Sequence, residues 1–437
     1  MKRTIHLGVK ILLLMAAFPS LAIGVPRMSM TAGTPCATCH VNPSGAGMRT
    51  EVGFDTGREL SLVSVHDLIH GPRALEKSLG HEFEGSKNHF FDHAVSTGID
   101  LRFQWAHLGE PKAVYDSQGQ RTVTEPDITM FPMQIQPYLK VALSKSLSVY
   151  GSYSMGPNTH KGEACDTVFE GQSCFDAAVQ YESSQGLTVR TGMIQPTIGM
   201  RWDDHTILTR GDAAQRRIPM IPPNYAEWGG EVSYQPISSI RGEIGIFESS
   251  NLSAALNAGQ GGATVNSVSY LGRISYLPHF QIGGNQHSDD DDWDSDEDED
   301  EDEDEVPYSP PINGHVWLSS SVYGSGSFHL LSGVVGLGLS NGLAVYSEIS
   351  HSIQGDDYTT LNGMFGSSWA IADSTVPSVR IERAQTKNGS QTTVVEAFVA
   401  SLEFFPVSFV EIRPEYRIVR TEAFLFGQPT VQLHLYY

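Results

Sequence analysis

The chain has 437 residues, of which 40% are hydrophobic and 18% are charged, and its formal net charge is −22. Beyond the first residues, no apolar run approaches the length of a transmembrane helix, which excludes a helical membrane protein. The sequence contains no phosphate-binding loop, nucleophile triad or zinc signature, and we expect no nucleic-acid partner. Two architectures remain: a soluble all-β protein and a transmembrane β-barrel.

Residues 1–24 are typical of a secretory signal peptide. Lys2 and Arg3 precede an apolar stretch over residues 11–18, and small residues occur at the expected cleavage positions, ending at Gly24. An uncleaved membrane anchor is the alternative. Export places the mature chain in an oxidising compartment, where c-type haem is attached in bacteria.

Residues 36–40 read Cys-Ala-Thr-Cys-His, the attachment motif of a c-type haem. In this motif Cys36 and Cys39 form thioethers to the haem vinyl groups, and His40 ligates the iron from one face. The alternatives are a redox-active cysteine pair and a local disulfide. The motif predicts one covalent haem c, held by a small monohaem cytochrome c-like region over residues 25–92.

The second axial ligand of the haem iron stays open between several methionines and histidines. The candidates are Met28, Met30, Met48, His66, His70, His81, His89 and His93. We favour His66 and His70, which are four residues apart and would share one face of a helix, and then Met48. Arg49 is a candidate partner for a haem propionate because its guanidinium presents a fork to carboxylates, although it can equally be solvated.

From Ser96 onward, apolar and polar residues alternate with period two in many segments. The clearest are residues 99–106, 147–154, 241–247, 268–276, 343–349 and 430–436. The chain also ends on an aromatic residue, Tyr437, as the closing strand of an outer-membrane protein does. We predict an all-β fold, a transmembrane antiparallel barrel over residues 93–437 with the haem region as a plug. At roughly 20 residues per strand with its connection, the barrel has about sixteen strands. A soluble sandwich, propeller or solenoid is the alternative.

Six long loops are expected in this barrel, over residues 109–127, 158–174, 198–227, 250–265, 286–313 and 354–362. The third contains Arg201, Arg210, Arg216 and Arg217, together with Trp202, Asp203, Asp204 and His205, and would shape a constriction if it folded inward. Cys165 and Cys174 are nine positions apart and are expected to form a loop-closing disulfide, with free thiols or a metal pair as alternatives.

The loop over residues 286–313 contains most of the net charge of the chain. From Asp289 to Glu305 there are fifteen acidic residues, and without them the net charge is about −7. Like charges at this density repel one another and stay hydrated, so the segment is expected to be a disordered external loop. The other interpretation is that it attracts cations such as Fe(II), since carboxylates are hard oxygen ligands.

A signal peptide, a single Cys36–Cys39–His40 motif and a barrel-length β region that ends in an aromatic residue resemble the fused cytochrome–porins of the bacterial outer membrane. These include the outer-membrane iron oxidases of Fe(II)-oxidising bacteria. The resemblance implies electron transfer between extracellular Fe(II), or another donor, and periplasmic cytochromes or other carriers, in a barrel embedded in outer-membrane lipid. Fe(II) oxidase activity is therefore a candidate activity.

Three functional alternatives remain open. The first is electron transfer across the outer membrane, in either direction, including export to extracellular acceptors. The second is a porin for solute diffusion whose haem is structural or sensory. The third is a soluble exported all-β cytochrome that binds rather than transfers electrons.

Overall fold

The computed structural model describes residues 36–41, 49–50, 52–53, 56, 61–62, 89–90, 94–107, 111–115, 120–124, 127–154, 173–200, 207–214, 218–222, 225–257, 263–282, 312–372 and 374–436. These residues include the Cys36–Cys39–His40 motif and the predicted closing strand over residues 430–436. The predicted signal peptide and the acidic run from Asp289 to Glu305 lie outside the described residues.

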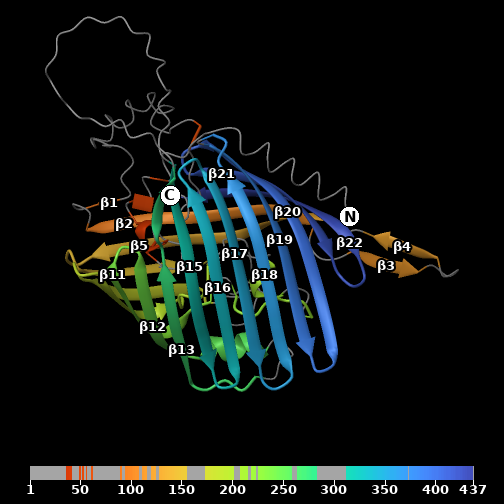
Figure 1. Cartoon of the computed structure of the whole chain (residues 1–437), viewed down its shortest axis with the longest axis horizontal. Helices are drawn as coiled ribbons and strands as arrows, with labels where there is room; N and C mark the ends of the chain where they lie inside the picture. The colour runs from red at the N-terminus through yellow and green to blue at the C-terminus, as the bar shows by residue number, and fades with distance from the viewer. Residues whose placement is uncertain are drawn as a thin grey trace, which may run out of the picture.

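Sixteen long strands form one antiparallel sheet that closes into a barrel (Figure 1). They are β2 (Val95–His107), β5 (Ile128–Ala142), β6 (Leu147–Tyr153), β7 (Phe175–Glu182), β8 (Leu187–Ile194), β11 (Glu227–Ile237), β12 (Ile240–Glu248), β13 (Val268–Tyr276), β15 (Ile312–Ser325), β16 (Phe328–Leu339), β17 (Leu343–Gln354), β18 (Tyr358–Trp369), β19 (Thr375–Asn388), β20 (Gln391–Val407), β21 (Val410–Arg420) and β22 (Leu425–Tyr436). Each pairs with the next in this order. The predicted fold class and strand number are confirmed.

The barrel closes because β2 pairs with β5 on one side and with β22 on the other. The register at this seam runs from Asp100 opposite Tyr436 to Ala106 opposite Thr430. Two short strands extend the sheet: β1 (His89–Phe90) pairs with β2, and β14 (His279–Ile282) continues β13 along β15. The predicted C-terminal strand over residues 430–436 is thus the strand that completes the ring.

Period-two alternation along the strands separates an apolar outside from a polar inside. On β12, Ile244 and Ile246 are 66% and 67% exposed, whereas Glu243 beside them is 3% exposed. On β19, Ile381 is exposed and the neighbouring Glu382 is buried. This is the reverse of a soluble sandwich and is the construction of a barrel that faces lipid. The chain is therefore an outer-membrane β-barrel protein, and the soluble alternative is wrong.

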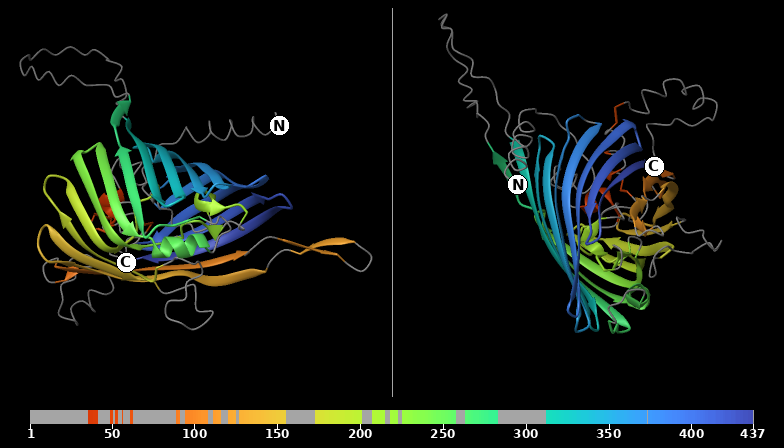
Figure 2. Two further views of the ribbon diagram at one scale, coloured as in Figure 1. Left: turned by 90° about the horizontal axis from the view of Figure 1, so that it is seen from below. Right: turned by 90° about the vertical axis from the view of Figure 1, so that its right-hand side faces the viewer.

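Three helices are described from end to end: α3 (Cys36–Cys39), the 3₁₀ helix η1 (Leu208–Arg210) and α7 (Ser250–Asn257). Val52, Gly53 and Thr56 are helical as well. None of the helices in this part of the chain is long and apolar enough to span a membrane. α7 lies in the lumen of the barrel (Figure 2), where Leu252 and Leu256 are buried in its apolar core. Glu227, the first residue of β11, accepts a hydrogen bond from the Leu252 N–H of α7 at 2.7 Å.

The two ends of the barrel differ in the length of their connections. At the end that holds Tyr436, most strands are joined by turns of two to five residues, such as 238–239 and 408–409. We call this the C-terminal end. The segment 283–311, which contains the acidic run, also joins β14 to β15 at this end. The opposite end, called the long-loop end, has four long connections: 108–127, which includes the hairpin β3 (Lys112–Tyr115) and β4 (Arg121–Thr124), 154–174, 195–226 and 249–267.

One predicted loop, residues 354–362, is wrong. Gln354 is the last residue of β17 and Tyr358 the first of β18, so a three-residue turn joins the two strands. Gly355 has a φ of 71° in this turn, a conformation that glycine adopts without steric cost. The cluster of polar residues after Tyr358 faces the lumen instead, with Thr360 and Asn362 buried.

Charged side chains inside the barrel are held in pairs and networks. At the seam, the His434 imidazole on β22 lies 3.0 Å from Asp100 of β2 and 3.0 Å from Glu411 of β21. Arg102 also lies 3.3 Å from Asp100. These four groups are almost completely buried, so their charges stabilise the fold only as long as each keeps its partners.

We predict that Asp100→Ala destabilises the barrel. The substitution leaves Arg102 and His434 buried without their shared carboxylate, and breaking a buried pair in this way costs about 3–5 kcal/mol. Urea denaturation of the barrel in lipid vesicles, followed by tryptophan fluorescence, measures the free energy of unfolding. Asp356→Ala, in the exposed turn after β17, is the control and is expected to change it by less than about 0.5 kcal/mol. Equal unfolding midpoints for the two variants would contradict the prediction.

Candidate functional site

The haem-attachment motif forms a single helical turn. α3 spans Cys36–Cys39, and the His40 backbone N–H donates to the Cys36 carbonyl at 2.8 Å. This bond keeps the two thiols and the imidazole on one compact turn. Both cysteines are thiols and not a disulfide. The arrangement matches the spacing that thioether attachment and iron ligation by an adjacent histidine require.

A strap formed by Arg49, Thr50, Val52 and Gly53 lies against the back of this turn. Thr50 donates its N–H to the Cys39 carbonyl at 3.0 Å and its hydroxyl to the Thr38 carbonyl at 2.5 Å. Arg49 and His40 form an isolated antiparallel bridge. Gly53 lies so close to Cys39 that a Cβ at this position would overlap the Cys39 carbonyl. The strap therefore fixes the backbone of the motif from Thr38 to His40.

The motif lies inside the barrel, against its wall. Figure 2 shows the N-terminal segment, in red, within the ring of strands. Cys36 is 5% exposed and belongs to a buried apolar cluster. The other members of the cluster are Met200, Ile207, Leu277, Trp317, Val334, Ala344, Tyr346 and Met364. The side of the motif that carries Cys36 thus faces an apolar, partly aromatic surface from which water is excluded.

Cys39 has a more open environment than Cys36, since its side chain is only half-buried. Burial raises the pKa of the Cys39 thiol above its ordinary value, and the neighbouring Cys36 raises it further, while Arg49 lowers it. The thiol is consequently neutral at pH 7.

Arg49, the predicted propionate partner, connects the strap to the seam of the barrel. Its guanidinium carbon lies 4.0 Å from the centre of the Tyr436 ring on β22, and it donates a hydrogen bond to Tyr138 on β5. A second attachment uses Ser61 and Leu62. The Ser61 hydroxyl lies 3.1 Å from that of Ser408, and the Leu62 N–H donates to the Phe405 carbonyl at 2.9 Å. The N-terminal region is therefore fixed to the C-terminal end of the barrel at two points.

The second axial ligand of the haem iron and the pairing of Cys165 with Cys174 stay predictions. Met28, Met30, Met48, His66, His70, His81 and His93 lie outside the described residues, and for His89 only the backbone is described, opposite Ser96. Cys174 is disulfide-bonded, and Cys165 lies outside the described residues.

The connection 195–226 folds into the lumen, as expected if the predicted loop 198–227 shapes a constriction. It starts from β8 and crosses to the opposite wall. Gly199 donates its N–H to Ser321 of β15 at 2.9 Å, and Leu208 donates its N–H to Glu382 of β19 at 2.8 Å. We call this connection the inward loop. Residues 201–206 and 215–217 and the side chain of Arg210 lie outside the described part, so the predicted role of the arginines stays a prediction.

Glu231 and Asp212 are among the carboxylates that fasten the inward loop, and sequence reasoning missed both. Glu231 of β11 accepts hydrogen bonds from Arg190 at 2.8 Å and from the Thr197 hydroxyl at 2.7 Å. Asp212 accepts from Tyr358, from the Thr386 hydroxyl at 2.7 Å and from the Ala214 N–H at 2.9 Å. Strand alternation would have placed Glu231 inside the barrel, whereas nothing in the sequence around Asp212 marks it.

The part of the barrel wall that lies behind the inward loop is shielded from solvent. Ser352 and Thr360 are 0% exposed and Glu348 is 1% exposed, although all three point into the lumen of a barrel this wide. The Met200 N–H donates to Glu348 at 3.3 Å, and the sulfur of Met220 accepts a hydrogen bond from Ser352 at 3.0 Å. The lumen along β17 and β18 is therefore filled by the inward loop rather than by water.

Within the described residues, no group of three or more histidine, cysteine, aspartate or glutamate side chains is placed to hold a metal ion.

No model of a known protein family matches the chain, and no curated protein matches it. Solved structures with a similar fold include OprB of Pseudomonas putida (TM-score 0.46, 11% identity, 79% of this chain and 95% of that chain). Another is the channel DcaP of Acinetobacter baumannii (TM-score 0.47, 7% identity, 78% of this chain and 97% of that chain). A third is OccK1 of Pseudomonas aeruginosa (TM-score 0.41, 10% identity, 80% of this chain and 99% of that chain). The chain has a porin-like outer-membrane barrel fold. At such low identities and TM-scores, the likeness gives no information on substrates.

We predict that Asp212→Ala releases the inward loop. The variant loses three hydrogen bonds to one buried carboxylate, two of them to the barrel wall, at about 1 kcal/mol or more each. Trypsin cleaves after arginine, and the loop contains Arg201, Arg210, Arg216 and Arg217. The rate of tryptic cleavage within residues 201–217 of the folded barrel, followed by mass spectrometry, should rise by about tenfold or more. Asp356→Ala is again the control, and equal cleavage rates in the two variants would contradict the prediction.

Proposed function

We propose that this chain is an outer-membrane electron-transfer barrel that holds one covalent haem c in its lumen. It would pass electrons between an extracellular donor, such as Fe(II), and periplasmic cytochromes or other carriers. The observation that carries the proposal is the position of the Cys36–Cys39–His40 turn inside the barrel, against an apolar wall and the inward loop.

The residues of the motif fit the group that the proposal requires. Cys36 and Cys39 would hold the haem through thioethers, and His40 would ligate its iron. When bound, the haem supplies a one-electron Fe(II)/Fe(III) couple. The chain contributes the rest: α3 presents the three groups on one turn, the strap fixes that turn, and Trp317 and Tyr346 exclude water on the side of Cys36.

The proposed orientation follows from the connections between strands. Outer-membrane barrels have short periplasmic turns and longer extracellular loops, so the C-terminal end would face the periplasm. The motif region is fastened to this end, through Arg49 on Tyr436 and Ser61 on Ser408. A haem there would be within reach of a periplasmic carrier. The acidic segment 283–311 joins the barrel at the same end, so this orientation puts it in the periplasm and not outside the cell, where the sequence alone predicts it.

The second candidate is a solute-diffusion porin whose haem is structural or sensory. The closed barrel with its polar lumen supports this function better than it supports electron transfer, which depends on the motif. The inward loop covers the wall along β17 and β18, which narrows the water-filled path that a diffusion pore needs. The two candidates therefore predict different conductances and different reduction of the haem by external donors.

The experiment that tests the proposal uses full-length protein from outer-membrane fractions. We expect covalent haem staining, reversible redox titration and stopped-flow reduction by Fe²⁺, together with small conductance in planar bilayers. A Cys36→Ala/Cys39→Ala double variant is the control and should fold into a colourless barrel. Colourless wild-type protein with haem-lyase expression would sink the proposal. A stained protein that no donor reduces, with the large conductance of an open channel, would favour the porin.

We predict that Gly53→Ala lowers the yield of covalent haem. The added Cβ overlaps the Cys39 carbonyl, and relieving such overpacking costs about 1–3 kcal/mol, which moves the strap away from the motif. The haem-to-protein ratio, from the absorbance of purified barrels, measures the effect. Gly333→Ala on β16 is the matched control, since a Cβ there meets nothing within 4 Å. A haem-to-protein ratio equal to that of the control would contradict the role given to the strap.

A further inference from the structure

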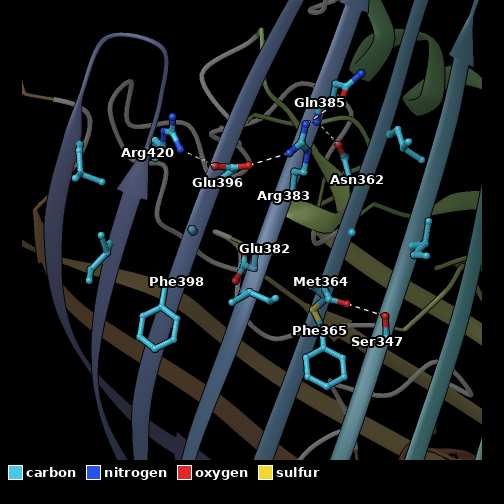
Figure 3. A pocket seen from close by; sticks show the side chains of 17 residues that line it. Ser347, Asn362, Met364, Phe365, Glu382, Arg383, Gln385, Glu396, Phe398 and Arg420 are labelled. Atoms are coloured by element: carbon cyan, nitrogen blue, oxygen red, sulfur yellow. Dashed lines mark hydrogen bonds and ion pairs between the residues drawn. The ribbon is translucent and has the colours of Figure 1, made fainter. Parts of the chain in front are cut away.

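Three charged side chains form a row on the outer face of the barrel, the face that is otherwise apolar. Arg383 of β19, Glu396 of β20 and Arg420 of β21 are directly opposite one another in the strand register. Glu396 lies 2.9 Å from Arg383 through one carboxylate oxygen and 3.6 Å from Arg420 through the other. Figure 3 shows the row from close by. We call it the arginine row.

The arginine row lies at the edge of the lipid-facing belt. Two residues further from the long-loop end, the outward residues in register are Phe365, Ile381, Phe398 and Ile418. Outward charges cost several kcal/mol at the middle of a bilayer and little at its interface, so the change from apolar to charged side chains marks the depth of the headgroups. The row is therefore at headgroup level, on the side of the long-loop end.

A groove with a volume of about 720 Å³ begins at the row and runs over the apolar side chains. Its walls include Leu361, Phe365, Phe398 and Leu425. Gly363 is opposite Arg383 in the register and has no side chain, so the groove stays open directly beside the guanidinium. Its volume and its apolar walls suit a hydrocarbon chain.

The charges of the row leave donors for a ligand. Two guanidinium groups flank one carboxylate, so the row has a net charge of +1. Arg383 and Arg420 are 57% and 72% exposed at the side chain, and each guanidinium has five N–H donors, of which Glu396 and Gln385 use only a few. Paired arginines in a fixed fork geometry recognise phosphate oxygens. A membrane lipid offers this chemistry at the depth where the row lies.

We propose that the arginine row and its groove bind a phosphorylated membrane lipid. Its phosphate contacts Arg383 and Arg420, and an acyl chain lies over Phe365 and Phe398. Glu396 holds the two arginines in place and also repels the phosphate, so it limits the affinity of the site. This lipid site is independent of the function of the lumen and of whether haem is attached.

The experiment uses the full-length barrel in a neutral detergent and fluorescent lipids with identical acyl chains. Phosphatidic acid is expected to bind and diacylglycerol to bind weakly. Arg383→Gln/Arg420→Gln should weaken the binding of phosphatidic acid by about tenfold or more, and Glu396→Gln should strengthen it by about threefold. Lys387→Gln, on the same strand and face, is the matched control and should leave binding within about twofold. Heat-modifiable migration on gels verifies that every variant is folded.

Several outcomes would overturn the proposal. They are equal binding of diacylglycerol and phosphatidic acid, unchanged binding in the double arginine variant, and weaker binding in Glu396→Gln. Inorganic phosphate is the last ligand to be compared. If millimolar phosphate binds as tightly as phosphatidic acid, the site recognises a free anion and the groove contributes nothing, which also contradicts a lipid site.

Discussion

The structure depends on the need to pair every backbone group within lipid, where no water is available to bond an open strand edge. The sheet meets this requirement by closing, and it closes where β2 pairs with β22. The same seam is where the N-terminal region is attached, since Arg49 reaches Tyr436 on β22 and Tyr138 on β5. The strands that close the barrel thus also anchor the motif region.

Closure also gives the barrel an interior that the strands must fill with polar groups, and these groups position the inward loop. Glu231, Glu382 and Asp212 each accept hydrogen bonds that connect the loop to a wall. In a barrel of about sixteen strands, the lumen is too wide for wall side chains to fill it alone. The loop, α7 and the strap supply the missing layer, so Cys36 can be buried in a fold whose centre would otherwise be water.

Much of this fold could be predicted because period-two alternation is a local property that survives in every strand. The closing strand at residues 430–436 and the polar lumen follow from it, and the number of strands follows from the length of the β region at roughly 20 residues per strand. The loop 354–362 was wrong because polar residues after Tyr358 look alike in a loop and on a lumen-facing strand. Asp212 could not be found, since its role depends on Tyr358 and Thr386, more than 140 residues away. The motif at residues 36–40 could be recognised because its three residues lie within five consecutive positions.

Inside and outside the barrel, the same residue types have opposite consequences. Arg102 in the lumen is paired with Asp100, so its charge is balanced by a carboxylate at the seam. Arg383 and Arg420 share a single carboxylate, Glu396, on the outer face, where the hydrocarbon tails of lipids offer no hydrogen-bond partner. A charge on that face persists at low cost only where headgroups or water can reach it. The arginine row therefore marks the depth of the headgroups on the side of the long-loop end, whereas the motif region is attached at the C-terminal end.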